Sequence, residues 1–224
     1  MSYKIYLSPS MQKNNAYAYG NTNEMEECNK IAEEAKKALE SCGFEVKKAV
    51  KGQSMAESIK ESNCWNADLH IPIHTNAANG SCDGTLVMVY SNSEKNLTPA
   101  NAIYDSVFEV TPGKTHRAIQ SRPDLAELCQ TKATAVYIEC EFHDNPEIAK
   151  WIINNTSILG QAIAKGVCDY FKIPFPEKQN NKTTENKIYR VQIGAFANKT
   201  NAENTLKNAK NAGFTDSYIK EELL

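Results

Sequence analysis

The stretch from Ala67 to Ala77, which reads ADLHIPIHTNA, constrains the fold of this chain more than any other. A short apolar run that contains isoleucines and is bounded by turn-forming residues is typical of a buried strand. This strand ends on His74, and the chain then breaks into Asn and Gly residues. An imidazole at the tip of a rigid strand is suited to hold a metal ion, but it can equally cap the strand through hydrogen bonds. The stretch alone leaves both interpretations open.

Along the rest of the chain, apolar runs typical of strands alternate with segments of helical periodicity. This alternation predicts an α/β fold, with a mostly parallel, twisted sheet flanked by helices. We expect strands at residues 4–7, 44–50, 67–74, 84–90 and 135–139, and helices at residues 24–41, 54–63, 98–109 and 146–171. Thr22 or Asn23 can cap the first helix, and Gly43 stands just past its end.

Polar groups stand at the ends of three of these predicted strands. The loop Ser8–Gln12 follows the first strand, His74 ends the third, and Glu139 ends the last. In parallel sheets of this class the functional groups collect at the carboxyl ends of the strands. The sequence therefore predicts a functional site at that edge of the sheet.

The composition changes after residue 175, which divides the chain into a domain, a linker and a smaller segment. Residues 1–175 carry the α/β pattern, and residues 176–187 form a polar linker with no apolar anchor in its Glu177–Lys187 part. In residues 188–224 we expect a strand at 188–196, a helix at 201–212 and a second strand at 217–219. This βαβ half-unit is too small to bury a core of its own comfortably.

Charge and apolar content describe an ordinary globular chain of 224 residues, with 41% hydrophobic residues and a net charge of -2. This balance favours neither nucleic acid nor an anionic membrane as a partner. No run approaches the roughly 20 apolar residues of a membrane-spanning helix. The N-terminus does not read as a secretory signal, and the seven cysteines are scattered without a CxxC pair. We therefore expect a protein made in the cytoplasm with reduced thiols.

Three segments of residues 1–175 resemble zinc-dependent N-acetylmuramoyl-L-alanine amidases of the Amidase_3 family. Ile73–Ala77 is similar to the family's Ser-Ile-His-x-Asn segment, and Glu24, ahead of Ile31, is similar to its helix-borne glutamate. Val136–Glu139, followed by Phe142 and Asn145, is similar to its Val-Leu-Val-Glu-x-Gly-Phe-x-x-Asn segment. These enzymes cut the bond between the lactyl group of muramic acid and the first L-alanine of the peptidoglycan stem.

The resemblance implies a role for several residues. Glu24 and His74 would be zinc ligands, and Glu139 would be the catalytic general base. Asn76 and His143 are candidates for substrate binding, although His143 can also be an ordinary surface-loop histidine. Zinc binds imidazole nitrogen and carboxylate oxygen, which is consistent with these residue types.

One position departs from the family pattern. The family's first ligand is a His in an Asp-Pro-Gly-His loop, whereas Ser8–Gln12 reads SPSMQ. Gln12 is the nearest substitute, through its amide oxygen. His70 is a poor one, because four residues of extended strand separate it from His74 by roughly 13 Å.

Tyr189–Phe196 and the helix after it resemble the first half of a SPOR-type repeat, a module associated with peptidoglycan binding. We expect this half-domain to bind the cell wall, and two copies can pair in a homodimer to protect open strand edges.

The leading prediction is a peptidoglycan amidase that uses zinc-activated water. We expect an endolysin from a phage or prophage, or a lytic enzyme of the mother cell, that reaches the wall after release from the cytoplasm. The alternative is a non-catalytic wall-binding protein that kept the amidase fold. An unrelated α/β hydrolase is disfavoured because the chain has no GxSxG motif.

Overall fold

Seven strands form one mixed sheet, in the order β2-β1-β3-β7-β4-β5, with β6 paired to β3. Their bounds are β1 Lys4–Pro9, β2 Glu45–Lys48, β3 Leu69–Asn76, β4 Leu86–Val89, β5 Ala118–Ser121, β6 Thr134–Ala135 and β7 Tyr137–Phe142. All pairings are parallel except that of β4 with β7. The α/β fold with a mostly parallel sheet is therefore confirmed.

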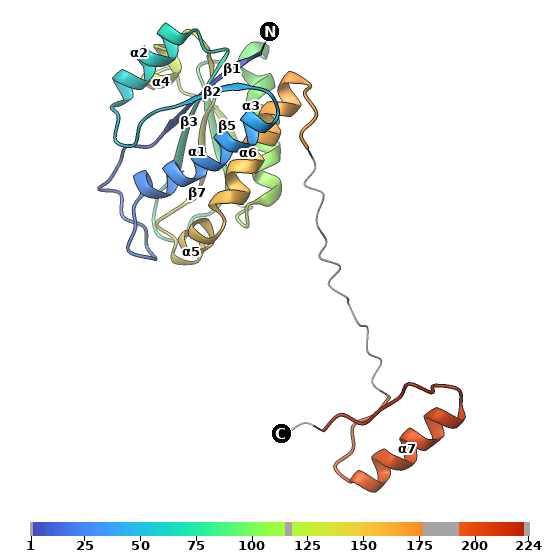
Figure 1. The fold of residues 1–224 in the computed structure, drawn as a ribbon. Coiled ribbons are helices and arrows are strands. Elements are labelled where there is room, and N and C mark those ends of the chain that lie inside the picture. The colour runs from blue at the N-terminus through green and yellow to red at the C-terminus, as the bar shows by residue number, and fades with distance from the viewer. Residues whose placement is uncertain (1, 115–117, 177–192, 222–224) are drawn as a thin grey trace. The chain divides into compact units, whose positions relative to one another are not determined.

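The computed structural model describes residues 2–114, 118–176 and 193–221 (Figure 1). The chain divides into two units, Met1–Glu177 and Lys178–Leu224. The first unit contains the sheet and six helices: α1 Glu24–Ser41, α2 Met55–Trp65, α3 Glu94–Val110, α4 Ala126–Cys129, α5 Pro146–Asn154 and α6 Thr156–Phe171. No helix in the described ranges has the length and apolar character needed to cross a membrane.

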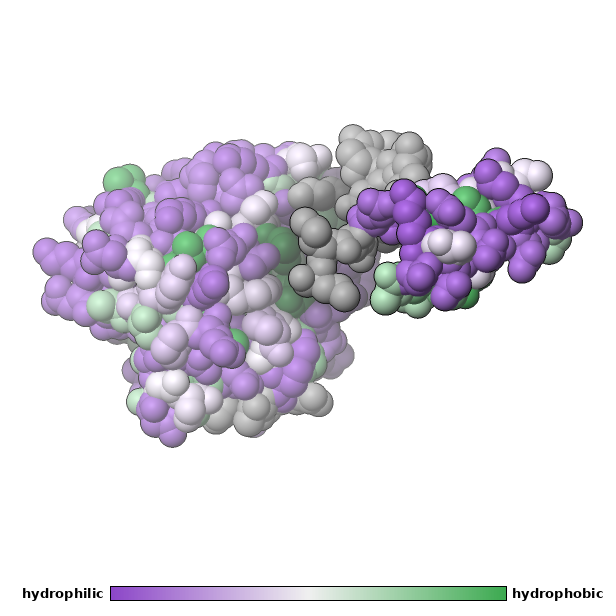
Figure 2. Space-filling view, turned by 90° about the horizontal axis from the view of Figure 1, so that it is seen from below, coloured by the Kyte–Doolittle hydropathy of each residue, from purple (hydrophilic) through white to green (hydrophobic). Residues whose placement is uncertain are grey.

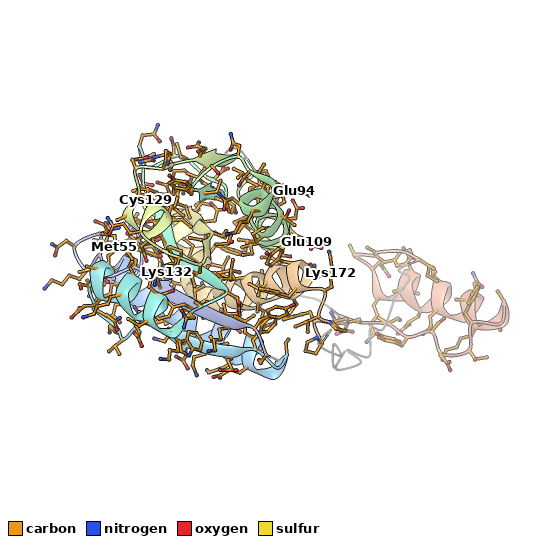
Figure 3. All side chains as sticks on the ribbon, turned by 90° about the horizontal axis from the view of Figure 1, so that it is seen from above. Met55, Glu94, Glu109, Cys129, Lys132 and Lys172 are labelled. Atoms are coloured by element: carbon orange, nitrogen blue, oxygen red, sulfur yellow. The ribbon has the colours of Figure 1, made fainter. Side chains whose placement is uncertain are left out.

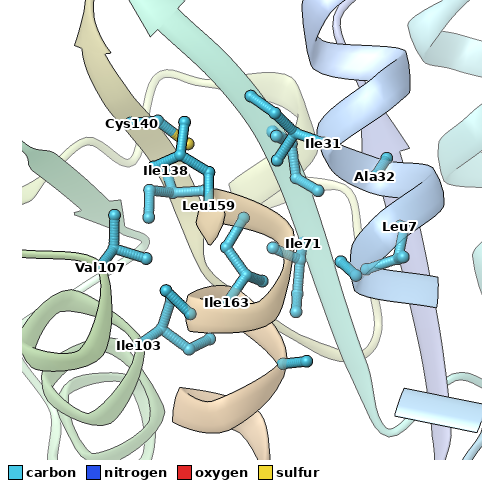
Figure 4. Packing of buried hydrophobic residues seen from close by; sticks show 14 of the residues in the cluster. Leu7, Ile31, Ala32, Ile71, Ile103, Val107, Ile138, Cys140, Leu159 and Ile163 are labelled. Carbon is cyan, nitrogen blue, oxygen red and sulfur yellow. The ribbon is translucent and has the colours of Figure 1, made fainter. Parts of the chain in front are cut away.

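The two faces of the sheet differ because side chains alternate along each strand. One face is apolar and packs against α1, α3 and α6; Figure 4 shows Ile71 and Ile138 near Leu159 and Ile163 of α6. This cluster is the main hydrophobic core.

The opposite face of the sheet carries buried polar side chains under the short helices α2 and α4. The Tyr6 hydroxyl donates to Glu61 of α2 at 2.8 Å, and His70 Nε2 lies 3.2 Å from Glu127 Oε1 of α4. Several polar groups on this face have polar partners, although His70 Nδ1 and Glu139 Oε2 have none among the described residues. The sheet is thus buried on both sides without being apolar on both.

Two predicted helices have different bounds in the structure. Residues 146–171 form two helices, because Asn155 leaves helical geometry (φ -130°, ψ 22°) and donates from Nδ2 to the Trp151 carbonyl at 2.7 Å. The third helix begins at Glu94, so that Pro99 lies inside it and not at its start. Figure 3 labels Glu94 and Glu109 near the two ends of this helix. The short elements β5 and α4 were not predicted either.

In the second unit, the described residues contain one helix, α7 Lys199–Asn211, capped by the Asn198 side chain. The predicted strand at 217–219 is wrong, and residues 193–196 are not a strand either. Residues 188–192 of the first predicted strand, and most of the predicted linker, lie outside the described residues. Among the described residues of this unit only the helix is regular, and an extended segment needs a neighbouring strand to pair with.

The surface seen in Figure 2 is mostly hydrophilic, with scattered hydrophobic residues. Several of the large exposed apolar side chains belong to the second unit: Ile193, Phe196, Phe214, Tyr218 and Ile219. Its small size leaves these residues without a core to enter.

Candidate active site

Three parallel neighbours in the sheet bring the candidate residues to one edge. β1 leads into the loop that carries Gln12, and β3 and β7 carry His74 and Glu139 directly opposite each other. Glu24 begins α1, where Asn23 accepts a hydrogen bond from the Glu26 N–H as the helix cap. A glutamate in the first turn is also favoured by the helix dipole. The chain therefore delivers these four side chains from the loop after β1, from β3 and β7, and from the start of α1. The prediction that Glu139 ends its strand is wrong, because β7 continues to Phe142.

Glu24 and His74 are in direct contact. Glu24 Oε1 lies 2.8 Å from His74 Nδ1, and both residues are buried. Burial alone would lower the pKa of His74, but the hydrogen bond to Glu24 and the charges of Glu139 and Glu24 outweigh it, and the pKa is raised. Burial likewise opposes the charge of Glu24, whose pKa is nevertheless lowered by its hydrogen bonds to His74 and Asn15. The contact between the two residues thus opposes the effect of burial on the pKa of each.

Glu139 is a half-buried residue whose carboxyl group has one unpartnered oxygen. Its Oε2 atom is buried and has no hydrogen-bond partner in the part of the chain that the structure describes. Burial raises the pKa of Glu139 to about 7, with the charge of Glu24 adding to the rise and that of His74 opposing it. A carboxyl group with a pKa near neutrality can both accept and donate a proton, as a general acid–base catalyst must.

Gln12 lies on the exposed side of this group. Its Nε2 atom is 3.4 Å from His74 Nδ1, and its Oε1 atom accepts a hydrogen bond of 2.8 Å from Asn15 Nδ2. The structure thus brings Gln12 to the same histidine nitrogen that Glu24 contacts.

The two predicted substrate contacts lie around this group. Asn76 ends β3 and its Oδ1 atom accepts from the Ala77 N–H at 2.8 Å. His143 is buried, with Nδ1 2.9 Å from the Thr75 carbonyl oxygen and its ring stacked on Tyr17 at 5.0 Å. Substrate binding by these residues stays a prediction, and the geometry gives His143 a packing role beneath the loop.

Two neighbours of the site were missed in the sequence. The Tyr137 ring stacks on the His74 ring at 4.5 Å, and Asn15 joins Gln12 to Glu24. Tyr137 precedes Glu139 by two positions on one strand, so strand alternation could have placed both on the same face. No comparable signal marks Asn15, which lies in an irregular loop.

Two donor atoms of the kind that zinc takes meet here, the imidazole nitrogen of His74 and a carboxylate oxygen of Glu24. Zinc takes imidazole nitrogen and carboxylate oxygen, and a catalytic site has three protein ligands. No group of three His, Cys, Asp or Glu side chains in the described ranges could hold a metal ion. Gln12 is the nearest further amide, but its nitrogen faces His74 Nδ1 and its oxygen accepts from Asn15, so its side chain would have to turn to ligate a cation. The unpartnered Oε2 of Glu139 supplies an acceptor for the proton of a water molecule beside such an ion.

Comparison with known proteins identifies the families to which the two units are similar. Residues 6–169 match the family described as N-acetylmuramoyl-L-alanine amidase, Amidase_3. The chain belongs to this family. Residues 184–222 match the SPOR domain.

Individual relatives include both full-length proteins and solved structures. The sporulation-specific N-acetylmuramoyl-L-alanine amidase of Bacillus subtilis (strain 168) is 27% identical over 167 residues, which are 74% of this chain and 62% of that protein. The chain spans only 40% to 62% of the length of the curated relatives it matches.

Among solved structures, the catalytic domain of the amidase CwlV from Bacillus (Paenibacillus) polymyxa var. colistinus has a TM-score of 0.69 at 15% identity, covering 77% of this chain and 99% of that one. The catalytic domain of an endolysin targeting Clostridia difficile has a TM-score of 0.63 at 28% identity, covering 75% and 98%. The first of these likenesses establishes the shared fold.

Proposed function

We propose that this protein is a peptidoglycan hydrolase that cleaves the amide bond between N-acetylmuramic acid and L-alanine with zinc-activated water. The observation that carries the proposal is the meeting of Glu24, His74 and Glu139 at one edge of the sheet, in a chain of the amidase family. Two relatives that match this chain are themselves named N-acetylmuramoyl-L-alanine amidases.

His74, Glu24 and Gln12 would hold the zinc ion. When bound, zinc lowers the pKa of a water molecule and polarises the carbonyl group of the amide. The aromatic ring of Tyr137 against His74 keeps the imidazole in one orientation. Asn15 donates a hydrogen bond to Oε2 of Glu24, and the other carboxylate oxygen of Glu24, Oε1, faces His74.

Glu139 would perform the proton transfers. Its unpartnered Oε2 accepts a proton from the attacking water and then delivers this proton to the nitrogen of the leaving L-alanine. Because burial raises its pKa to about 7, it is basic enough for the first step and acidic enough for the second. Its rigid position in β7 sets the geometry of both transfers.

Digestion of purified peptidoglycan by the full chain tests this proposal. We expect new amino termini without new reducing sugar ends. Glu139→Gln should bind zinc and lose at least about 100-fold in rate, as general-base removal typically does. His74→Ala should lose both zinc and activity. Wall binding without new amino termini in the wild type would contradict the proposal and support the non-catalytic alternative.

The second unit would attach the enzyme to the cell wall, as its match to the SPOR domain suggests. We further propose that two copies associate through this unit. The exposed side chains of Ile193, Phe196 and Phe214 supply apolar surface for such contact. In sedimentation, the full chain should behave as a dimer, and a protein of residues 1–177 should behave as a monomer. A monomeric full chain would contradict the pairing.

The cellular context that we propose is that of an endolysin. Its support is the 28% identity with an endolysin catalytic domain over 98% of that domain. An endolysin produced inside a susceptible cell should leave the cell intact until the membrane is permeabilised, and should then cause rapid lysis. Cells that do not lyse after permeabilisation, despite soluble active protein, would count against this role.

A further inference from the structure

The loop that follows β3 contains Asn79 and Gly80, the one Asn-Gly pair in the sequence. Because glycine has no Cβ atom, its main-chain nitrogen is open to the side-chain amide of the asparagine before it. Both residues are exposed, so water reaches this amide. A reaction between the side-chain amide and the next main-chain nitrogen therefore meets less steric hindrance here than at the other asparagines.

The main-chain nitrogen of Gly80 faces a carboxylate. Its N–H donates a hydrogen bond of 2.8 Å to Oδ2 of Asp144, and the N–H of Ala78 donates to the same oxygen at 2.8 Å. A carboxylate at hydrogen-bond distance from a proton is in position to accept that proton as a general base. Asp144 thus lies where it can make the Gly80 nitrogen a better nucleophile.

The side-chain oxygen of Asn79 faces three donors. Oδ1 lies 3.2 Å from the main-chain nitrogen of Ser81, 2.8 Å from Ser81 Oγ and 3.4 Å from Cys82 Sγ. A main-chain N–H only donates, so the oxygen and not the nitrogen of the amide has to face Ser81. Attack on the amide carbon places negative charge on this oxygen, and donors already aimed at it stabilise that charge, as in an oxyanion hole.

We propose that Asn79 is a site of self-catalysed deamidation. The Gly80 nitrogen attacks Cγ of Asn79 while its proton passes to Asp144, and the new C–N bond closes a succinimide ring. The bond from Cγ to Nδ2 breaks, and Nδ2 leaves as ammonia with the proton that Asp144 returns. Water then opens the ring at either carbonyl group, which gives aspartate or isoaspartate at position 79.

The products change how the loop is attached. In isoaspartate the main chain runs through the side-chain carbon, which adds an atom between the N–H groups of Ala78 and Gly80 that share one oxygen of Asp144. Either product also adds a negative charge near that carboxylate. We therefore expect deamidation to loosen the loop from Asp144. The inference goes beyond the proposed function, and no step of it depends on zinc or on peptidoglycan.

The test is incubation of the full chain at neutral pH, followed by peptide mapping with mass spectrometry, which measures deamidation at each asparagine. We expect Asn79 to react first, and to react faster in the folded chain than in the same chain unfolded in guanidinium chloride. A folded loop has less freedom to bring the two groups together, so a faster rate in the folded chain has to come from the surrounding base and donors. An equal or slower rate in the folded chain would overturn the proposal.

Two variants then assign the rate to the two kinds of contact. Asp144→Asn keeps an oxygen that accepts hydrogen bonds but removes the base, and Ser81→Ala removes the hydroxyl donor. General bases and oxyanion donors contribute about 100-fold or more in enzymes, and in this exposed loop we expect each variant to slow deamidation by about threefold or more. Asp105→Asn, which removes an exposed carboxylate of α3, is the matched control and should keep the wild-type rate. A wild-type rate in folded Asp144→Asn would contradict the role of Asp144 and overturn the proposal.

Discussion

Position 12 carries an amide where the amidase family has an imidazole, and this residue decides the quality of the metal site. Imidazole is a stronger zinc ligand than a neutral amide. We therefore predict that Gln12→His tightens Zn²⁺ binding and that Gln12→Ala weakens it, with cleavage at limiting Zn²⁺ following the same order. Chelator competition measures both. Equal affinities in all three proteins would show that Gln12 is not a ligand.

Glu141 is a buried carboxylate that supports the edge of the sheet beside the site. It accepts hydrogen bonds from the N–H groups of Gly84 at 2.7 Å and Gly113 at 2.8 Å. Glu141→Ala leaves these donors unsatisfied, at a cost of about 1–3 kcal/mol for each buried group. We predict a loss of about 3 kcal/mol in the free energy of unfolding.

Urea denaturation followed by tryptophan fluorescence measures this loss, because Trp65 and Trp151 are the two tryptophans and both lie in the first unit. The exposed Glu109 gives the matched control, since Glu109→Ala should change stability by less than about 0.5 kcal/mol. The role given to Glu141 would be wrong if both variants behaved alike.

The site residues that belong to strand and helix patterns could be predicted from the sequence. The site residues whose position depends on the conformation of a loop could not. Glu24 begins a helix and His74 and Glu139 lie on neighbouring strands, and the structure brings them together. Asn15 acts through its place in an irregular loop. Glu127 reaches His70 only because α4 folds over the polar face of the sheet, which no local pattern indicates.

Helix α6 packs closely on its neighbours through glycine. A Cβ atom at Gly160 would lie 2.6 Å from the Ile31 carbonyl oxygen and 2.7 Å from the Ala35 nitrogen of α1. Gly160→Ala would gain about 1 kcal/mol in helix propensity, but it would force the two helices apart. We predict a net loss of stability of about 1–2 kcal/mol.

The same urea measurement tests this prediction. Lys165→Ala, on the exposed side of α6, is the control and should cost no more than about 0.5 kcal/mol for its ion pair with Asp169. A Gly160→Ala variant as stable as the wild type would mean that α1 and α6 can separate without penalty.

At the level of elements, apolar periodicity predicted the central strands and the long helices. Apolar periodicity did not predict that β4 runs antiparallel to β7, because the direction of a strand depends on how the chain returns to the sheet. The break between α5 and α6 at Asn155 was not predicted, because the apolar spacing continues through it. At the break, the Asn155 side chain donates a hydrogen bond to the Trp151 carbonyl. The strand expected at 217–219 failed because β-propensity without a partner strand does not make a sheet.

The whole molecule divides its tasks between two units. The first unit, Met1–Glu177, contains the hydrophobic core and every candidate ligand. We predict that residues 1–177 fold with the thermal midpoint of the full chain and cleave a soluble muropeptide at an equal rate. On intact cell walls the shortened protein should cleave more slowly, because it lacks the segment that matches the SPOR domain. Equal rates on intact walls would contradict a wall-binding role for the second unit.

Mass spectrometry of the fragments released from peptidoglycan tests the central claim most directly, since it identifies the bond that is cut. We predict stem peptides that begin with a free L-alanine amino group, together with glycan whose muramic acid lactyl groups carry free carboxylates. Both products should be absent after digestion with Glu139→Gln. Fragments cut within the glycan or within the stem peptide, with the muramic acid–alanine bond intact, would contradict the account.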